Sequence, residues 1–236
     1  MEPGLYKGGA VQRIAGFSLI GFAVLLAAGA ALRPGADVED ASSAIQTIAD
    51  NNGGRWQVAH IVIALSFFAL MIGMAGIYRS ISSERAAAWA RLGFYLAIAG
   101  TTVRSVFLAV EGVGRAAVAE DWEAATGADK EAVFLVFSTL DGVLEGLRSV
   151  TDIVSGLSFA FFGVAILLST VYSRWLGWTI LVAGAGWIVV GFVIGTDGLT
   201  DSVNAPFAVV TALTVLWALA MGVVVTRRER QAVDTT

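Results

Sequence analysis

The sequence contains no cysteine and only one histidine, His60. The absence of cysteine excludes disulfides, thiolate metal sites, iron–sulfur clusters and cysteine nucleophiles. A single histidine excludes multi-histidine metal sites and the His-x-x-x-His signature, and it offers little support for haem ligation. We therefore expect no metal ion and no cofactor.

Charged residues are also scarce: they make up 14% of the 236 residues, whereas 57% are hydrophobic. Ordinary soluble domains have about 25% charged and about 45–50% apolar residues. The mean hydropathy of +0.77 agrees with this deficit of charge. The composition predicts an integral membrane protein whose main partner is the lipid bilayer, and we expect no nucleic-acid partner.

Six apolar segments are long enough to cross a bilayer, which takes about 20 residues for ~30 Å of hydrocarbon. They cover residues 14–32, 58–78, 90–112, 153–172, 176–195 and 206–226. The connections include RPGADVEDAS and ADNNGGR, whose Gly, Asp and Asn residues are typical of loops. We predict an all-α fold, a single domain of six transmembrane helices over residues 1–236. The first segment has a signal peptide as its alternative interpretation, because small residues follow its apolar run.

The basic residues are distributed unevenly over the two sides of this topology. One side holds Lys7, Arg13, Arg79, Arg85, Arg91, Arg174, Arg227, Arg228 and Arg230, and the other only Arg33, Arg55, Arg115 and Lys130. The positive-inside rule therefore predicts that both termini are cytoplasmic.

The stretch LDGVLEGLRSVTDIVSG, residues 140–156, carries four charges just before the fourth span. Asp141, Glu145, Arg148 and Asp152 are spaced by four, three and four residues, which places them on one stripe of a helix. This pattern predicts an amphipathic outer helix that begins near residue 132 and leads into the fourth span. For Asp141 and Glu145 we favour a solvated face. Arg148 and Asp152 lie where the apolar run begins, and for them a solvated face and pairing with Arg104, Glu111 or His60 are equally supported.

Arg104 lies about 12 residues into the third span, or about 18 Å at the rise of an α-helix. A charge at such depth costs at least ~2.5–3.5 kcal/mol unless it is paired or hydrated. Glu111 on the same helix and Asp152 on the fourth span are the candidate partners. His60, at the outer end of the second span, either titrates near neutral pH or is a hydrogen-bonded boundary residue. The candidate polar pocket therefore consists of Arg104, Glu111, Arg148, Asp152 and His60, with no catalytic residue assigned.

Glycines inside the spans indicate close helix contacts. Gly184, Gly191 and Gly195 occupy such positions in the fifth span, and Gly142 and Gly146 form a small-x-x-x-small pair. Glycine-rich helix faces could also join copies of the chain as a homo-oligomer or bind a membrane partner protein.

Three short motifs resemble an uncharacterised family of six-span prokaryotic membrane proteins of unknown function. They are RIAG at 13–16, IADN at 48–51 and FFGVAILLSTVYSRWLGWTILVAGAGWIV at 161–189. Trp175 departs from the pattern, since it stands where that family continues with a Pro-Arg pair. The resemblance implies a six-span architecture in the prokaryotic cytoplasmic membrane and transfers no activity.

Three classes of function remain open from the sequence. An accessory or structural membrane protein needs only packing surfaces, and a transporter of a cation, proton or small solute would use the polar pocket from the outer face. A membrane-embedded enzyme is the least supported class, because no nucleophile–base pair and no metal constellation is visible.

Overall fold

The computed structural model describes residues 8–35, 40–50 and 53–234, and helices provide all of their regular structure. The elements are α1 (Gly8–Leu32), α2 (Ala41–Asp50), α3 (Gly54–Ser80), α4 (Glu84–Ala109), the π-helical turn η1 (Val110–Gly114), α5 (Arg115–Ala124), α6 (Gly127–Leu168), α7 (Arg174–Asp197) and α8 (Asp201–Asp234). Six of the described helices are long and apolar enough to span a membrane. The predicted all-α class with six spans is thus confirmed.

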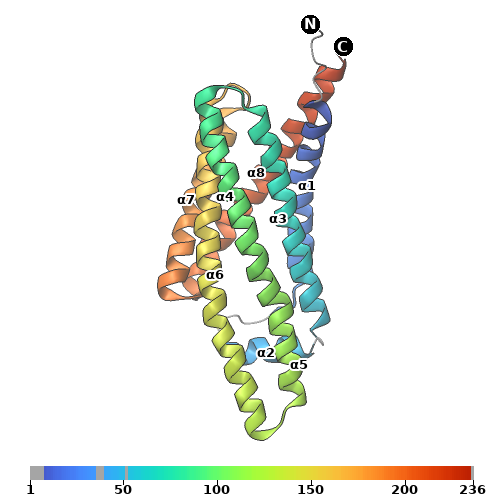
Figure 1. Cartoon of the computed structure of the whole chain (residues 1–236), viewed down its shortest axis with the longest axis vertical. Coiled ribbons are helices and arrows are strands. Elements are labelled where there is room, and N and C mark those ends of the chain that lie inside the picture. Colours follow the sequence, from blue (N-terminus) through green and yellow to red (C-terminus); the bar gives the residue numbers. More distant parts are fainter. Residues whose placement is uncertain (1–7, 36–39, 51–52, 235–236) are drawn as a thin grey trace.

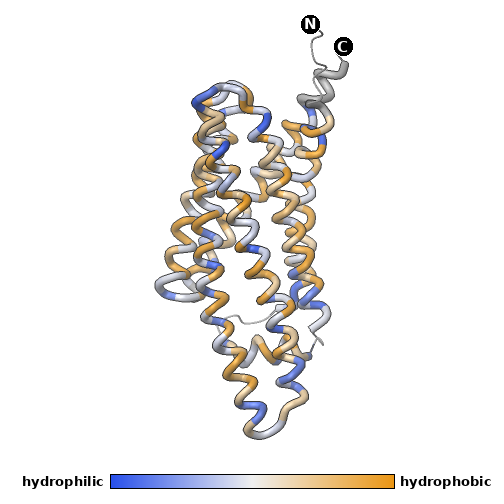
Figure 2. The backbone as a smooth tube through the Cα atoms, in the orientation of Figure 1, coloured by the Kyte–Doolittle hydropathy of each residue, from blue (hydrophilic) through white to orange (hydrophobic). Residues whose placement is uncertain are grey.

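The six long helices run side by side, and the two ends of the bundle hold different elements (Figure 1). One end holds both termini and the α3–α4 and α6–α7 turns, and we name it the terminal end. The opposite end, the cap end, holds α2, α5 and the start of α6. Hydrophobic residues dominate between these ends (Figure 2). Lys7 lies outside the described residues, as do the side chains of 228–234.

Glycines bring α6 and α7 into backbone contact. A Cβ added to Gly156 or Gly184 would lie 2.6 Å from the carbonyl oxygen of the other residue. A Cβ on Gly191 would likewise lie 2.8 Å from the carbonyl oxygen of Ser149, so the predicted packing role of the α7 glycines is confirmed. Gly142 and Gly146 make no such close helix contact, because a Cβ added to either would meet nothing within 4 Å.

Helix α8 crosses the bundle diagonally, from α7 at the cap end to α1 at the terminal end (Figure 1). Near the terminal end, a Cβ on Gly222 would lie 2.8 Å from the carbonyl oxygen of Gly16 in α1. Toward the cap end, α8 instead packs on α7, where the rings of Trp187 and Phe207 meet edge to face at 5.3 Å. Helices α1 and α8 therefore diverge toward the cap end.

The cap is a small hydrophobic unit formed by α2, α5 and the first part of α6. Its core comprises Ala44, Ile45, Ile48, Ala49, Trp56, Ala116, Ala119 and Phe137. The interpretation of RPGADVEDAS and ADNNGGR as loops is therefore wrong where they enter α2, since residues 41–50 are helical. Ile45 and Ile48 are fully buried on one face of α2. Packing of this face against α5 and α6 stabilises α2. The helix is too short for its apolar residues to show a clear helical periodicity in the sequence.

The amphipathic helix predicted before the fourth span is part of α6, which is continuous over 42 residues. At 1.5 Å per residue this helix is about 63 Å long, about twice the thickness of the hydrocarbon. Its first part extends beyond α1, α3, α7 and α8, lies beside α5 and belongs to the cap (Figure 1). The helix ends at Leu168, four residues before the predicted end of the fourth span.

The third span also continues past its predicted end, because the π-helical turn η1 joins α4 to α5. The backbone N–H of Arg115 donates to the carbonyl oxygen of Val110, five residues earlier. A Cβ on Gly112 in this turn would lie 2.5 Å from the Cβ of His60. The glycine thus allows α3 to approach η1 closely, which brings His60 beside Glu111.

Candidate functional site

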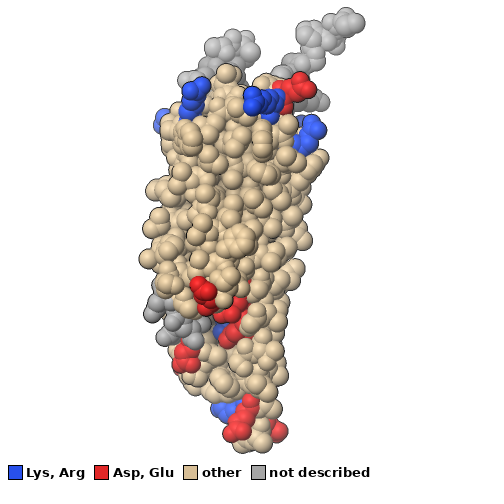
Figure 3. Space-filling model, turned by 90° about the vertical axis from the view of Figure 1, so that its left-hand side faces the viewer, with Lys and Arg blue, Asp and Glu red and all other residues tan. Residues whose placement is uncertain are grey.

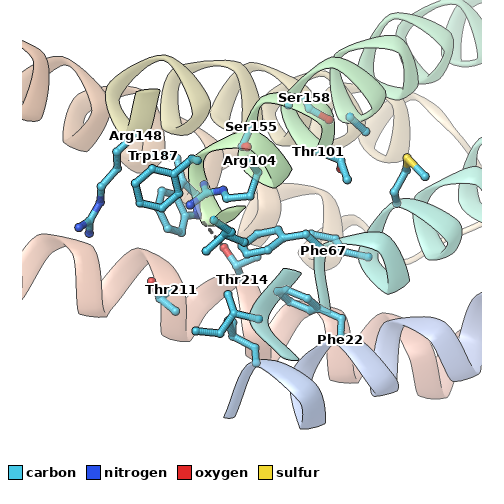
Figure 4. Close-up of a pocket in the computed structure, with 18 of the residues that line it drawn as sticks. Phe22, Phe67, Thr101, Arg104, Arg148, Ser155, Ser158, Trp187, Thr211 and Thr214 are labelled. Atoms are coloured by element: carbon cyan, nitrogen blue, oxygen red, sulfur yellow. Dashed lines mark hydrogen bonds between the residues drawn. The ribbon is translucent and has the colours of Figure 1, made fainter. Parts of the chain in front are cut away.

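A cavity of about 260 Å³ lies between the six long helices, and Figure 4 shows residues of its wall. Because Arg33, His60 and Glu111 line it, the cavity extends toward the cap end. Its wall is mostly apolar and aromatic, with residues such as Phe22, Phe67, Met74, Phe107, Phe159 and Trp187. Five charged or titratable side chains also line it: Arg33, His60, Arg104, Glu111 and Arg148. Four of the five residues of the predicted polar pocket are therefore in the wall, and the fifth, Asp152, contacts Arg104 from behind it.

Asp152 is the buried partner of Arg104. The Nη2 of Arg104 donates to Oδ1 of Asp152 at 2.6 Å, and the Asp152 side chain is completely buried. The second oxygen, Oδ2, lies 3.9 Å from Nε of Arg148, one helical turn away on α6. The guanidinium of Arg104 also lies 4.6 Å from the centre of the Phe67 ring, a cation–π contact. The carboxylate of Asp152 thus forms ion pairs with two arginines.

Glu111 belongs to a second cluster and does not pair with Arg104. Its Oε1 lies 3.3 Å from Nη2 of Arg33, and its Oε2 lies 3.5 Å from Nε2 of His60. Trp56 anchors both residues, since its indole N–H donates to the Glu111 carbonyl oxygen at 2.7 Å. Nδ1 of His60 lies 2.7 Å from the carbonyl oxygen of Trp56, so Nδ1 carries a proton.

Two arginines of this region were missed by the sequence interpretation, which placed both in outer loops. Arg33 binds Glu111, as described above, and lies over the Trp56 ring at 4.9 Å. Arg115 is 4% exposed, and its Nη2 lies 3.2 Å from Oδ1 of Asp141. The four-residue step from Glu111 to Arg115 was the available signal, because it continues one face of the helix.

The expectation of a solvated face for Asp141 and Glu145 is wrong, since both side chains contact other elements. Asp141 pairs with Arg115 of α5, and Glu145 accepts a hydrogen bond from the backbone N–H of Leu199 at 3.3 Å. Both side chains are half-buried. Helix α6 thus uses its charged stripe to hold α5 and the α7–α8 connection.

Positive charge exceeds negative charge around the cavity. Arg33, Arg104 and Arg148 face Glu111 in the wall and Asp152 behind it, which gives three cations against two anions. Among the contacts of the described residues, no hydrogen bond is made by the terminal nitrogens of Arg148. Its guanidinium instead lies 4.5 Å from the centre of the Phe207 ring. The hydroxyl of Thr211, also in the wall, is buried without a hydrogen-bond partner. The cavity therefore offers unused donors.

Comparison with protein-family models, curated proteins and solved structures found none that matches the chain. The resemblance to the six-span prokaryotic family thus stays an expectation. Within the part of the chain that the structure describes, no group of three or more His, Cys, Asp or Glu residues could hold a metal ion.

Proposed function

We propose that this multi-pass protein lies in the prokaryotic cytoplasmic membrane with both termini in the cytoplasm and the cap outside. The positive-inside rule supports this orientation, because Lys and Arg gather at the terminal end and most of the Asp and Glu at the cap end (Figure 3). The described cations at the terminal end are Arg13, Arg79, Arg85, Arg91, Arg174 and Arg227.

Labelling of single cysteines tests the orientation, because the chain contains no cysteine of its own. Ser82 lies in the α3–α4 turn and Thr126 in the α5–α6 turn, and both are exposed. In intact cells, a membrane-impermeant maleimide should label Thr126→Cys and should label Ser82→Cys only after permeabilisation. The reverse pattern would contradict the orientation.

We further propose that the protein binds a small anion in the cavity and acts as an accessory binding protein. The observation that carries this proposal is the convergence of Arg33, Arg104 and Arg148 on one cavity that has fewer carboxylates than guanidinium groups. In a site of low dielectric an excess positive charge attracts anions and repels cations. The charge balance therefore favours an anion over the cation or proton considered for a transporter.

Binding is better supported than transport, because the bundle is tightly packed beyond the cavity. Leu19, Phe162, Ile166 and Trp217 in the terminal half are each fully buried. The Trp217 indole N–H donates to the carbonyl oxygen of Leu176, which joins α8 to α7 there. Tightly packed side chains thus separate a solute in the cavity from the terminal end.

Trp187 is a built-in reporter for the test, since it lines the cavity and lies 5.9 Å from the guanidinium of Arg104. The tryptophan fluorescence of the purified protein should change on titration with hexanoate or benzoate and should not change with the matching alkylammonium ions. Arg148→Gln should weaken anion binding by about 10–100-fold, the value of a charged hydrogen bond of about 1.5–3 kcal/mol. Arg85→Gln, an exposed residue at the terminal end, is the matched control. Binding of the cations instead would refute the proposal.

A further inference from the structure

The cavity is elongated along the bundle, and its charges lie at one end. Its wall extends from Ala97 on α4 to Glu111 on η1 and from Met74 to His60 on α3, about 21 Å along each segment. Arg104 lies at the middle of this length, and the other charged or titratable residues of the wall lie on its cap side. The deeper half contains no charged side chain in its described wall, and its hydroxyls include Ser158, which donates to the carbonyl oxygen of Gly93. The cavity thus combines a cationic mouth with an uncharged, apolar chamber.

The cavity also borders the divergence between α1 and α8. Phe22, Leu26 and Ala30 line it from α1, whereas Phe207, Thr211 and Thr214 line it from α8. The close backbone contact between these helices lies on the terminal side, at Gly16 and Gly222, beside the deep end of the cavity, because Cβ atoms added to Gly222 and to Gly73 would both contact Leu19. In a bilayer, this seam faces the lipid of the leaflet on the cap side.

The unused donors lie where a ligand head group would sit. Arg148 extends toward α8, the helix that carries Thr211 (Figure 4). The buried Thr211 hydroxyl has no hydrogen-bond partner among the described residues, and the Arg148 guanidinium contacts Asp152 through Nε at 3.9 Å and the Phe207 ring at 4.5 Å. A guanidinium can donate two parallel hydrogen bonds to one carboxylate or phosphate. A compact anionic head would satisfy these donors and balance the excess charge.

The size of the cavity limits the tail of the ligand. Its volume of about 260 Å³ lies just below the range of ~300–1,000 Å³ that is typical of small-molecule pockets. A phospholipid with two acyl chains cannot be enclosed in this space. One narrow chain fits the length of the chamber.

We infer that the ligand is a single-chain amphiphile with a compact anionic head, taken up from the cap-side leaflet between α1 and α8. This inference rests on the proposed anion site and names the class of molecule that occupies it. The head binds at Arg148 and Thr211, and the chain occupies the chamber bounded by Phe67, Met74 and Phe159.

Competition for a fluorescent fatty acid tests the inference on the full chain in detergent. The probe is cis-parinarate, which accepts energy from tryptophan and so reports binding near Trp187. Palmitate should displace it at least tenfold more strongly than methyl palmitate, which lacks the charge, or dioleoyl phosphatidylglycerol, which has two chains. Comparison of palmitate with lysophosphatidate then distinguishes a carboxylate head from a phosphate head. Equal displacement by palmitate and its methyl ester would overturn the inference.

Two variants separate the head site from the chain site. Arg148→Gln should weaken parinarate binding at least tenfold, with Arg85→Gln again as the control. Ala97→Leu narrows the deep chamber and should weaken parinarate at least tenfold while hexanoate still binds, which also shows that the variant is folded. If hexanoate binds to the unaltered protein in an Arg148-dependent manner and parinarate does not, the proposed anion site stands and the amphiphile is refuted.

Discussion

Replacement of Asp152 by leucine should destabilise the protein more than replacement of Arg104, its partner in the ion pair. Asp152→Leu removes the only carboxylate within 4 Å of both Arg104 and Arg148 among the described residues. Arg104 is 6% exposed, so it would be left as a buried charge without a partner. Loss of one member of a buried pair typically costs about 3–5 kcal/mol.

Arg104→Leu is milder because Asp152 keeps a second cation. Nε of Arg148 lies 3.9 Å from its free oxygen, and two charges about 4 Å apart attract each other by about 4 kcal/mol at an effective dielectric constant near 20. Part of the lost interaction is therefore recovered, and we expect a cost of about 1–3 kcal/mol for this variant. The double variant, with leucine at both positions, should be more stable than Asp152→Leu alone, since apolar residues can replace a buried pair at little cost.

Thermal unfolding in detergent, followed by fluorescence, measures these differences. In a chain of this size 1 kcal/mol shifts the midpoint by about 2–4 °C, so Asp152→Leu should lower it by about 6–20 °C. Glu131→Gln, an exposed acid on the same helix, is the control and should change the stability by less than about 0.5 kcal/mol. The shared pairing of Asp152 is refuted if Asp152→Leu costs no more stability than Arg104→Leu. It is also refuted if the double variant is no more stable than Asp152→Leu.

Two further predictions concern helix contacts. Gly156→Ala should lower the unfolding midpoint, because its Cβ would lie 2.6 Å from the Gly184 carbonyl oxygen, whereas Gly142→Ala meets open space and should gain up to about 1 kcal/mol of helix propensity. Equal losses in the two variants would contradict this packing. Asp40→Ala should speed hydrogen exchange of α2 amides, since Asp40 accepts hydrogen bonds from the backbone N–H and hydroxyl of Ser42. These bonds lower the Asp40 pKa, so the support of α2 is complete above the unfolded value of about 3.9 and is lost as the pH falls through the lowered pKa. Exchange that stays constant over this range would refute the role.

The six spans were predictable because a bilayer demands about 20 apolar residues in a row, a requirement that leaves a strong signal in one chain. Helix α2 was not, since its ten residues are shorter than the window in which helical periodicity becomes clear. Its helical state depends on burial of Ile45 and Ile48 against α5 and α6, partners that are distant in the sequence.

The site was predictable to the extent that its charges lie within apolar segments. Arg104 and Asp152 were noticed because a charge there needs a partner, and the structure pairs them. Arg33 and Arg115 were missed, because a cation in a polar connection carries no such cost in the sequence. Both contact the Trp56 ring, which is distant from them in the sequence, and the four-residue step from Glu111 to Arg115 was the one local signal.

The π-helical turn at Val110–Gly114 makes the number of residues in this segment as important as their identity. A π-helical turn takes up one residue more than an α-helical turn, so the same five residues in α-helical geometry would rotate α5 by about 100° relative to α4. Ala116 and Ala119 would then leave α2, and Arg115 would leave Asp141. Deletion of one residue that converts η1 into an α-helical turn would therefore keep α5 in register, whereas one residue added in α-helical geometry would preserve all six spans and every charged side chain and yet disassemble the cap.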